Sequence, residues 1–537
     1  MRPLIRSKLP PEPPESIHSH GSDKTTSPAS DGDRARHGPD HIYLPHRDVC
    51  QRYAMRFFEE IQSIYWFYSP EQFYTLVDKT YADHGRTSTP SWLCSLYSIF
   101  AICAVKEESA SMESLHASAT KSSSEYLAMA KSFGVQVCDE ATTDAVRALS
   151  LMSLALHSTC FTVTAYLITG MTVRMAYTLG LHRNISPNHI DSVSRARVHR
   201  LWWTIYLLDQ EVAIQLGYPC AIIDNIAGIQ TPPASESILD PGPGTPHGYQ
   251  ACCVSLIKLK KKISHILYVA PALSSRRVVP FSAVTTCLSD LHAWFSHLPS
   301  HLSWGTGTAP SHRRAIAVLH LRYWTTLIHI QRPFLLDTAI RSSSSSLPLS
   351  KKHHYEELSH SCLSSALSAI TIVKRMREHR LLSSLVLFDV QSIQELVYVF
   401  MLAQGCYAGT KKGEAAAEGL AAGMDAMRGM ERVGWRERIL PETEAQVAAR
   451  GGVGVARRDA FGGVGGGRDR SGDEEDAEGD EDDEKEGRKE GMGDREDRGV
   501  VDQGGVAWSG ELAPFQPMED SDALNDAFFE NFQDTDW

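Results

Sequence analysis

Apolar residues recur three and four positions apart through most of the chain between residues 43 and 440. This spacing is typical of helices with one buried face, whereas the alternation of a β-strand is rare here. The clearest helices are expected at residues 53–68, 91–106, 122–133, 141–180, 195–216, 250–269, 281–296, 312–331, 356–379 and 386–408. The pattern therefore predicts an all-α, multi-helix domain over residues 43–440.

The periodicity stops at both ends of this region. Residues 1–42 are rich in Pro, Ser, His and charge, and residues 441–510 are dominated by Gly, Asp, Glu and Arg. Segments of this composition cannot bury enough apolar surface to offset the entropy of ordering the chain. We expect disordered segments on both sides of the helical domain.

Residues 511–537 have a pattern of their own, in which bulky apolar side chains alternate with acidic ones. The apolar positions are Leu524, Phe528, Phe529, Phe532 and Trp537. Such alternation is typical of disordered activation segments, which form an amphipathic helix when a groove on a coactivator accepts them. Leu524, Phe528 and Phe532 are four residues apart and would share one face of that helix.

Two helices in the middle of the chain carry its most specific pattern. Ile168, Met171, Met175 and Leu179 are predicted to line one face of the first helix, which Gly180 can end with a left-handed cap. A polar stretch, 184–194, follows as a loop. The second helix is predicted to bury Val198, Leu201, Trp202, Ile205, Leu208 and Val212.

The letters of these helices, GMTVRMAYTLGLHRN from residue 170 and VHRLWWTIYLLDQEVAIQLGYP from residue 198, carry a resemblance. They resemble the middle homology region of fungal binuclear zinc cluster transcription regulators, with its pattern A-x-R-M-A-x-x-L-G-L-H-R, then R-R-R-x-W-W-x-x-x-x-x-D-R, then G-R-P. Residues 43–107 look like the opening helices of that region, and residues 319–336 like a later one. The resemblance implies a helical regulatory domain and a nuclear location.

The positions that match the family motifs are expected to be structural or regulatory. They are Arg174, Met175, Ala176, Leu179, Gly180, Leu181, His182, Arg183, Arg200, Trp202, Trp203, Asp209, Gly217, Pro219, Arg332 and Pro333. The chain departs from the pattern where Gln210 follows Asp209 and where Tyr218 replaces the arginine of G-R-P. These changes weaken any transfer of a detailed polar network from the family.

The family's DNA-binding module holds two zinc ions with six cysteines, which include two C-x-x-C pairs. Tetrahedral zinc needs closely spaced thiolates of this kind, and the eleven cysteines of this chain form no C-x-x-C pair. We therefore expect no zinc cluster and no cofactor in this chain. Either an upstream exon encodes the cluster, or the protein reaches DNA through a DNA-bound partner.

Charge and hydropathy limit the other partners. A formal net charge of -12 argues against nonspecific DNA binding by the whole chain, because affinity for phosphates comes from Lys and Arg. The start, MRPLIRSKLPPEPPES, lacks the apolar segment of a secretory signal. Residues 148–173 carry no formal charge, but their Ser and Thr content favours burial in a bundle over a membrane span. No membrane anchor is expected.

Several polar residues need an explanation of their own. Arg174 and Asp209 occur in helices with buried faces, so we expect them to form a buried ion pair between the two helices. His182 and Arg183 follow the first helix, where cations interact favourably with the negative end of its dipole, although a DNA contact is an alternative.

The tryptophans and a lysine cluster leave alternatives open. Trp202 should pack in the core and Trp203 should be half-buried, or both could border a pocket for an apolar effector. Lys258, Lys260, Lys261 and Lys262 alternate with apolar residues at helical spacing, which favours a solvated face over a nuclear import signal.

Taken with the resemblance, these patterns predict a nuclear transcription regulator. Its helical domain would restrain or release an acidic C-terminal activation segment in response to a small molecule or a partner protein. The alternatives are a helical scaffold or small-molecule-binding protein without a role in transcription, and an all-α enzyme. No catalytic motif such as H-E-x-x-H or G-x-S-x-G supports the enzyme.

Overall fold

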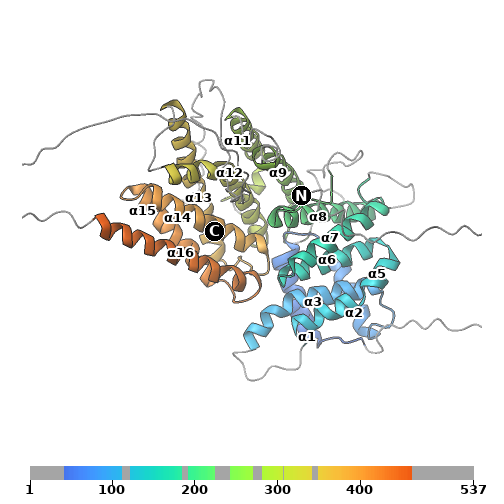
Figure 1. Cartoon of the computed structure of the whole chain (residues 1–537). Coiled ribbons are helices and arrows are strands. Elements are labelled where there is room, and N and C mark those ends of the chain that lie inside the picture. Colours follow the sequence, from blue (N-terminus) through green and yellow to red (C-terminus); the bar gives the residue numbers. More distant parts are fainter. Residues whose placement is uncertain are drawn as a thin grey trace, which may run out of the picture. The chain divides into compact units, whose positions relative to one another are not determined.

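The computed structural model of the chain describes residues 42–111, 121–183, 191–223, 242, 244–269, 281–305, 308–341 and 349–461. It divides into two compact units, Met1–Tyr43 and Leu44–Trp537. The first lies almost wholly outside the described residues, so the account below concerns the second. Its described part contains helices and no strand, which confirms the predicted all-α class (Figure 1).

The first half of this unit is a bundle around two buried helices. Its elements are α1 (Arg47–Arg56), the π-helix η1 (Phe57–Gln62), α2 (Pro70–Ala82), α3 (Pro90–Ser111), α4 (Ser123–Ser132), α5 (Gly134–Glu140), α6 (Thr143–Ser158) and α7 (Thr162–Thr178). Helix α3 packs against α1, α4, α5 and α6, and α6 packs against α3, α4, α5 and α7. Because neighbours cover them on several sides, α3 is continuously buried from Trp92 to Ala104 and α6 from Ala145 to Ser158.

Burial explains the uncharged stretch that begins in α6. Two of its serines donate their hydroxyls to carbonyl oxygens of the bundle, Ser150 to Val146 at 2.8 Å and Ser153 to Ala165 at 2.8 Å, whereas the buried Ser158 hydroxyl has no partner among the described residues. Buried hydroxyls with such partners leave no unsatisfied donor. Among the helices of the described residues, none is both long and apolar enough to cross a membrane.

The single helix predicted over residues 141–180 is wrong, because α6 and α7 are separate helices. The chain turns between them at Cys160, whose φ of 66° lies in the left-handed region. The Phe161 N–H donates to the Leu156 carbonyl at 2.8 Å and closes this turn. No Gly or Pro lies between the two helices, so nothing in the sequence interrupts the apolar spacing at this turn.

The second half begins with α8, which is buried on every side from Arg200 to Ala213 and packs against α6, α7 and α9. The elements are α8 (Ser192–Leu216), α9 (Tyr249–Ser264), the π-helix η2 (His265–Val269), α11 (Phe281–Ser296), the 3₁₀ turns η3 (Ser300–Leu302) and η4 (Pro310–His312), α12 (Arg313–Arg341), α13 (Leu349–Glu378), α14 (Leu387–Cys406), α15 (Lys411–Gly429) and α16 (Gly434–Phe461). The predicted domain boundary at residue 440 falls inside α16.

Small residues allow α15 to lie close to α14 (Figure 1). A Cβ atom at Gly419 would lie 2.5 Å from the Phe400 ring, and one at Gly423 would lie 2.8 Å from Val397. Helix α15 was not expected from the sequence, because its Gly and Ala residues provide little apolar periodicity.

A buried ion pair joins α12 to the start of α14. Arg314 donates to the Asp389 carboxylate at 2.9 Å, and Asp389 also accepts the Ser383 N–H at 2.9 Å. The same guanidinium donates to the Glu60 carbonyl at 3.1 Å, which connects α12 to η1. The two halves of the sequence therefore share one polar cluster in the interior.

Candidate functional site

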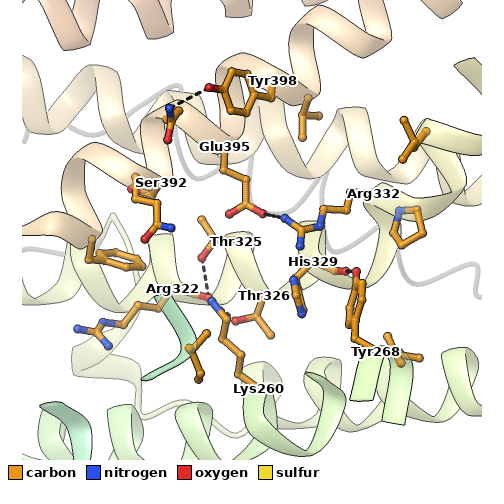
Figure 2. Close-up of a pocket in the computed structure, with 18 of the residues that line it drawn as sticks. Lys260, Tyr268, Arg322, Thr325, Thr326, His329, Arg332, Ser392, Glu395 and Tyr398 are labelled. Atoms are coloured by element: carbon orange, nitrogen blue, oxygen red, sulfur yellow. Dashed lines mark hydrogen bonds and ion pairs between the residues drawn. The ribbon is translucent and has the colours of Figure 1, made fainter. Parts of the chain in front are cut away.

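A pocket of about 620 Å³ lies between α8, α9, η2, α12 and α14 (Figure 2). Its size is within the range of sites that bind small organic molecules. Apolar side chains form much of the wall, among them Leu256, Ile257, Leu267, Phe388, Val399 and Leu402. Leu336 and Ile340 also line it and remain 46% and 68% exposed, so the pocket opens to solvent at the C-terminal part of α12.

One wall carries a buried ion pair. Arg322 of α12 contacts the Glu211 carboxylate of α8, and the Tyr65 hydroxyl donates to the same carboxylate. All three side chains are buried, and burial lowers the pKa of Arg322 and raises that of Tyr65. The Arg322 guanidinium also lies over the Phe388 ring, 4.9 Å from its centre. A ligand in the pocket would touch Arg322 and Glu211, which connect α12 to α8 and, through the Tyr65 hydroxyl, to the first half of the unit.

A second pair lies across the pocket, where Arg332 of α12 donates to Glu395 of α14 at 2.8 Å. Next to it the His329 ring lies 4.6 Å from the Tyr268 ring, and the Tyr268 hydroxyl donates to the His329 carbonyl at 2.6 Å. Burial, with Arg332 and Lys260 nearby, holds the pKa of His329 well below its usual value. His329 is therefore neutral at pH 7 and contributes a ring with hydrogen-bonding nitrogens.

Lys260 is the remaining cation of the wall. Its side chain is half-buried and extends from α9 in the direction of α12 (Figure 2). Within the described part of the chain, no hydrogen bond or ion pair is formed by its ammonium group. Burial lowers its pKa, and Arg332 lowers it further while Glu395 raises it. The site thus holds two paired guanidinium groups and one unpaired ammonium group.

The lysine cluster does not form one solvated face as predicted. Lys258 lies over the Trp203 ring, 5.0 Å from its centre, whereas Lys260 lines the pocket. Lys262 is exposed and bonds Asp290 at 2.7 Å. Helix α9 is covered by α8, α11 and α12 on different sides, so its lysines reach different environments.

The cap predicted at Gly180 is confirmed. Gly180 has a φ of 71°. The Leu181 N–H donates to the Ala176 carbonyl at 3.0 Å, and the Gly180 N–H donates to the Tyr177 carbonyl at 3.0 Å. This is the Schellman arrangement, which needs a residue that tolerates the left-handed conformation. The predicted apolar face of α7 is wrong, however. Its fully buried residues are Ala165, Thr169, Thr172, Val173 and Ala176, whereas Ile168, Met171 and Met175 are half-buried and Leu179 is exposed.

The predicted ion pair between Arg174 and Asp209 is also wrong. Arg174 lies on the exposed face of α7. Asp209 is buried in α8 and accepts the N–H groups of Ala221 at 3.0 Å and Ile222 at 2.8 Å. Its carboxylate therefore folds the segment after α8 back onto that helix, and the helix ends at Gly217, with a φ of 68°.

Pro219 belongs to the same returning segment. Its carbonyl accepts the Tyr166 hydroxyl at 2.8 Å, and the rings of Tyr166 and Tyr218 are 5.0 Å apart. Tyr218, the residue that replaces arginine in the family pattern, is 45% exposed. The G-x-P motif thus holds the end of α8 against α7 through aromatic contacts.

His182 packs as an aromatic ring, so the expectation that it acts as a cation at the helix end is wrong. The ring is buried, 4.8 Å from Tyr177 and 5.9 Å from Trp202, and burial and the neighbouring Arg183 lower its pKa. Exposed Arg183 donates from Nε to His182 Nε2 at 3.2 Å.

Trp202 packs in the core, as predicted. Trp203 is buried too, at 4% exposed, so the expected half-buried position is wrong. Neither tryptophan lines the pocket described above. Val198, expected in the same buried set, is half-buried. Arg200 is buried and lies over the Trp66 ring, 5.6 Å from its centre.

Of the motif residues, Arg332 and Pro333 line the pocket. Glu211, His329 and Glu395 were missed as site residues, and Lys260 was considered only as part of the lysine cluster, because residues this far apart in sequence give no sign that they line one pocket. The activation positions Leu524, Phe528, Phe529, Phe532 and Trp537 lie outside the described residues. All eleven cysteines are described and none forms a disulfide, and no group of three or more His, Cys, Asp or Glu in the described residues is placed to hold a metal.

Comparison with known proteins shows which domain the helical region resembles. Residues 54–236, from α1 to beyond α8, match the fungal specific transcription factor domain. Over this segment the chain is similar to that family. The matched segment contains η1, α7 and α8, and it supplies Tyr65 and Glu211 to the cluster at the pocket.

Three relatives are regulators by name. The chain is 23% identical over 350 residues to an uncharacterized transcriptional regulatory protein of Schizosaccharomyces pombe, which covers 64% of this chain and 43% of that protein. It is 24% identical over 360 residues to the thiamine repressible genes regulatory protein thi1 of the same organism, covering 65% and 44%. It is 28% identical over 241 residues to the lactose regulatory protein LAC9 of Kluyveromyces lactis, covering 44% and 26%. The chain spans less than half the length of each of these relatives.

Proposed function

We propose that this protein is a nuclear transcription regulator whose helical domain binds a small-molecule effector in the pocket between α9, α12 and α14. The family match and the named relatives support a role in transcription. The observation that carries the effector is the pocket itself, which combines an apolar wall with a few fixed polar groups, as in small-molecule sites generally.

The position of the pocket supports a regulatory role for its ligand. Glu211 lies in the segment that matches the family, whereas Arg322 and Arg332 lie beyond it. A ligand that contacts Glu211 of α8 and also an arginine of α12 stabilises those conformations in which the two helices are placed to make both contacts. A ligand shifts a conformational equilibrium only by its difference in affinity for the two states, and such bridging contacts provide that difference.

The output of the proposed regulator is its C-terminal segment, 511–537. The segment recruits the transcription machinery through its acidic and aromatic residues, and DNA is reached through a zinc cluster encoded elsewhere or through a DNA-bound partner. The enzyme alternative is disfavoured because the relatives are regulators by name. An activation assay distinguishes the proposed regulator from a helical scaffold without a role in transcription.

The assay fuses the whole chain to a heterologous DNA-binding module in yeast and measures a reporter gene. We expect activation, and we expect it to fall at least about tenfold in the triple variant Leu524→Ala, Phe528→Ala, Phe532→Ala. A matched control changes Asn525, Asn531 and Gln533 to Ala and leaves the apolar positions intact. A silent fusion that also stays outside the nucleus would favour the scaffold, and equal loss in both variants would remove the assigned role of the aromatic positions.

A further inference from the structure

The geometry points to an anionic amphiphile as the ligand of the pocket, with its anionic group on Lys260 and its apolar part toward Leu336 and Ile340. We infer that a carboxylate is the simplest such group. This inference rests on the proposed function, since it names the chemical class of the proposed effector.

The charges of the wall favour an anion. Glu211 pairs with Arg322 and accepts the Tyr65 hydroxyl, and Glu395 pairs with Arg332. The third carboxylate of the wall, Asp337, is half-buried and has an interaction of its own. Every acidic group of the lining is thus engaged already, so a cationic ligand would have to displace an existing partner.

Lys260 is in the opposite situation. An ammonium group removed from water without a partner loses solvation that nothing replaces, and a buried lysine responds by a lowered pKa. The direction of the Lys260 pKa agrees with this loss, with burial as the largest cause. A ligand carboxylate within hydrogen-bonding distance would supply the missing partner in a partly desolvated site, where charge-assisted hydrogen bonds are strong.

The apolar wall sets the rest of the ligand. Leu256 and Ile257 are buried on α9, and Leu336 and Ile340 lie exposed at the opening on α12. An alkyl or aromatic body attached to the anion would cover these exposed side chains as it filled the pocket of about 620 Å³. A saturated carboxylate of about ten carbons fits within sites of this size.

The test measures binding of decanoate and of 1-decanol to the full chain at pH 7 by titration calorimetry. The two probes share an alkyl chain and differ in charge. We expect decanoate to bind at least about tenfold more tightly than the alcohol, the difference expected of a charge-assisted bond. In Lys260→Met this preference disappears, whereas the affinity for 1-decanol is unchanged or higher.

Control variants keep the result interpretable. Lys262→Met removes a lysine of the same helix that is exposed and bonds Asp290 outside the pocket, so it should leave both affinities unchanged. Lys260→Arg keeps the charge and should retain part of the preference for decanoate, which also provides a readout if the methionine variant does not fold.

The outcomes separate the two proposals. If neither probe binds, the effector pocket fails together with the ligand class. If 1-decanol binds as tightly as decanoate, the pocket stands and the anionic class is refuted. If Lys260→Met keeps the preference for decanoate, Lys260 is not the anchor. Reporter activation by the tethered chain is independent of all three results.

Discussion

Glu211→Gln provides the sharpest test of how the interior is held together beside the pocket. The substitution keeps the shape of the side chain and removes its charge, which leaves the Arg322 guanidinium paired with a neutral amide. The two side chains are only 7% and 8% exposed. Breaking a buried pair from one side is strongly destabilising, because the remaining charge has lost its partner away from water.

The magnitude follows from burial. Removing one partner of a buried pair costs about 3–5 kcal/mol. Because glutamine keeps an amide oxygen that can accept from Arg322, we expect a cost at the lower end, about 3 kcal/mol. With an unfolding entropy of roughly 2.1 cal/mol/K per residue over roughly 400 residues, this cost lowers the melting temperature by about 4 °C. The melting is followed by circular dichroism at the helical band.

Asp425→Asn is the matched control. Asp425 and Arg377 also form a carboxylate–guanidinium pair, but their side chains are 59% and 45% exposed. Exposed pairs contribute about 1 kcal/mol or less, which predicts a shift of about 1 °C or less. Equal shifts in the two variants would refute the argument, because burial would then make no difference to the value of the pair.

Two further predictions concern packing and pH. Gly419→Ala places a methyl group 2.5 Å from the Phe400 ring and should destabilise the protein by about 1–3 kcal/mol. Gly170→Ala has open space around it and should stabilise the protein by about 0.5–1 kcal/mol. Urea unfolding of both variants checks the contrast, and a loss of stability in Gly170→Ala would contradict it. Burial lowers the pKa of His157 and His320 to about 4. Between pH 6.5 and 4 the unfolded chain therefore binds protons that the folded chain does not. The free energy of unfolding should fall as the pH is lowered through this window and level off below it. His320→Gln should make this fall shallower, as measured by urea titrations at a series of pH values.

The local rules of the sequence predicted much of the helix inventory. A helix needs only neighbouring residues for its hydrogen bonds and its apolar spacing, so α3, α8, α9 and α14 are close to their predicted ranges. The Gly180 cap was predictable for the same reason, because the left-handed conformation is a property of one residue. The break at Cys160 was not, since packing of α6 and α7 imposes that conformation on a residue that does not favour it.

The sequence by itself determined the helical class, the family resemblance and the acidic and aromatic composition of the C-terminal segment. Only the tertiary structure decided which polar groups meet. Asp209 turned out to bind backbone N–H groups rather than Arg174, and Lys260 left the expected solvated face to line a pocket. Periodicity gives the direction of a side chain around its own helix, but the partner it finds depends on which other helix covers that direction.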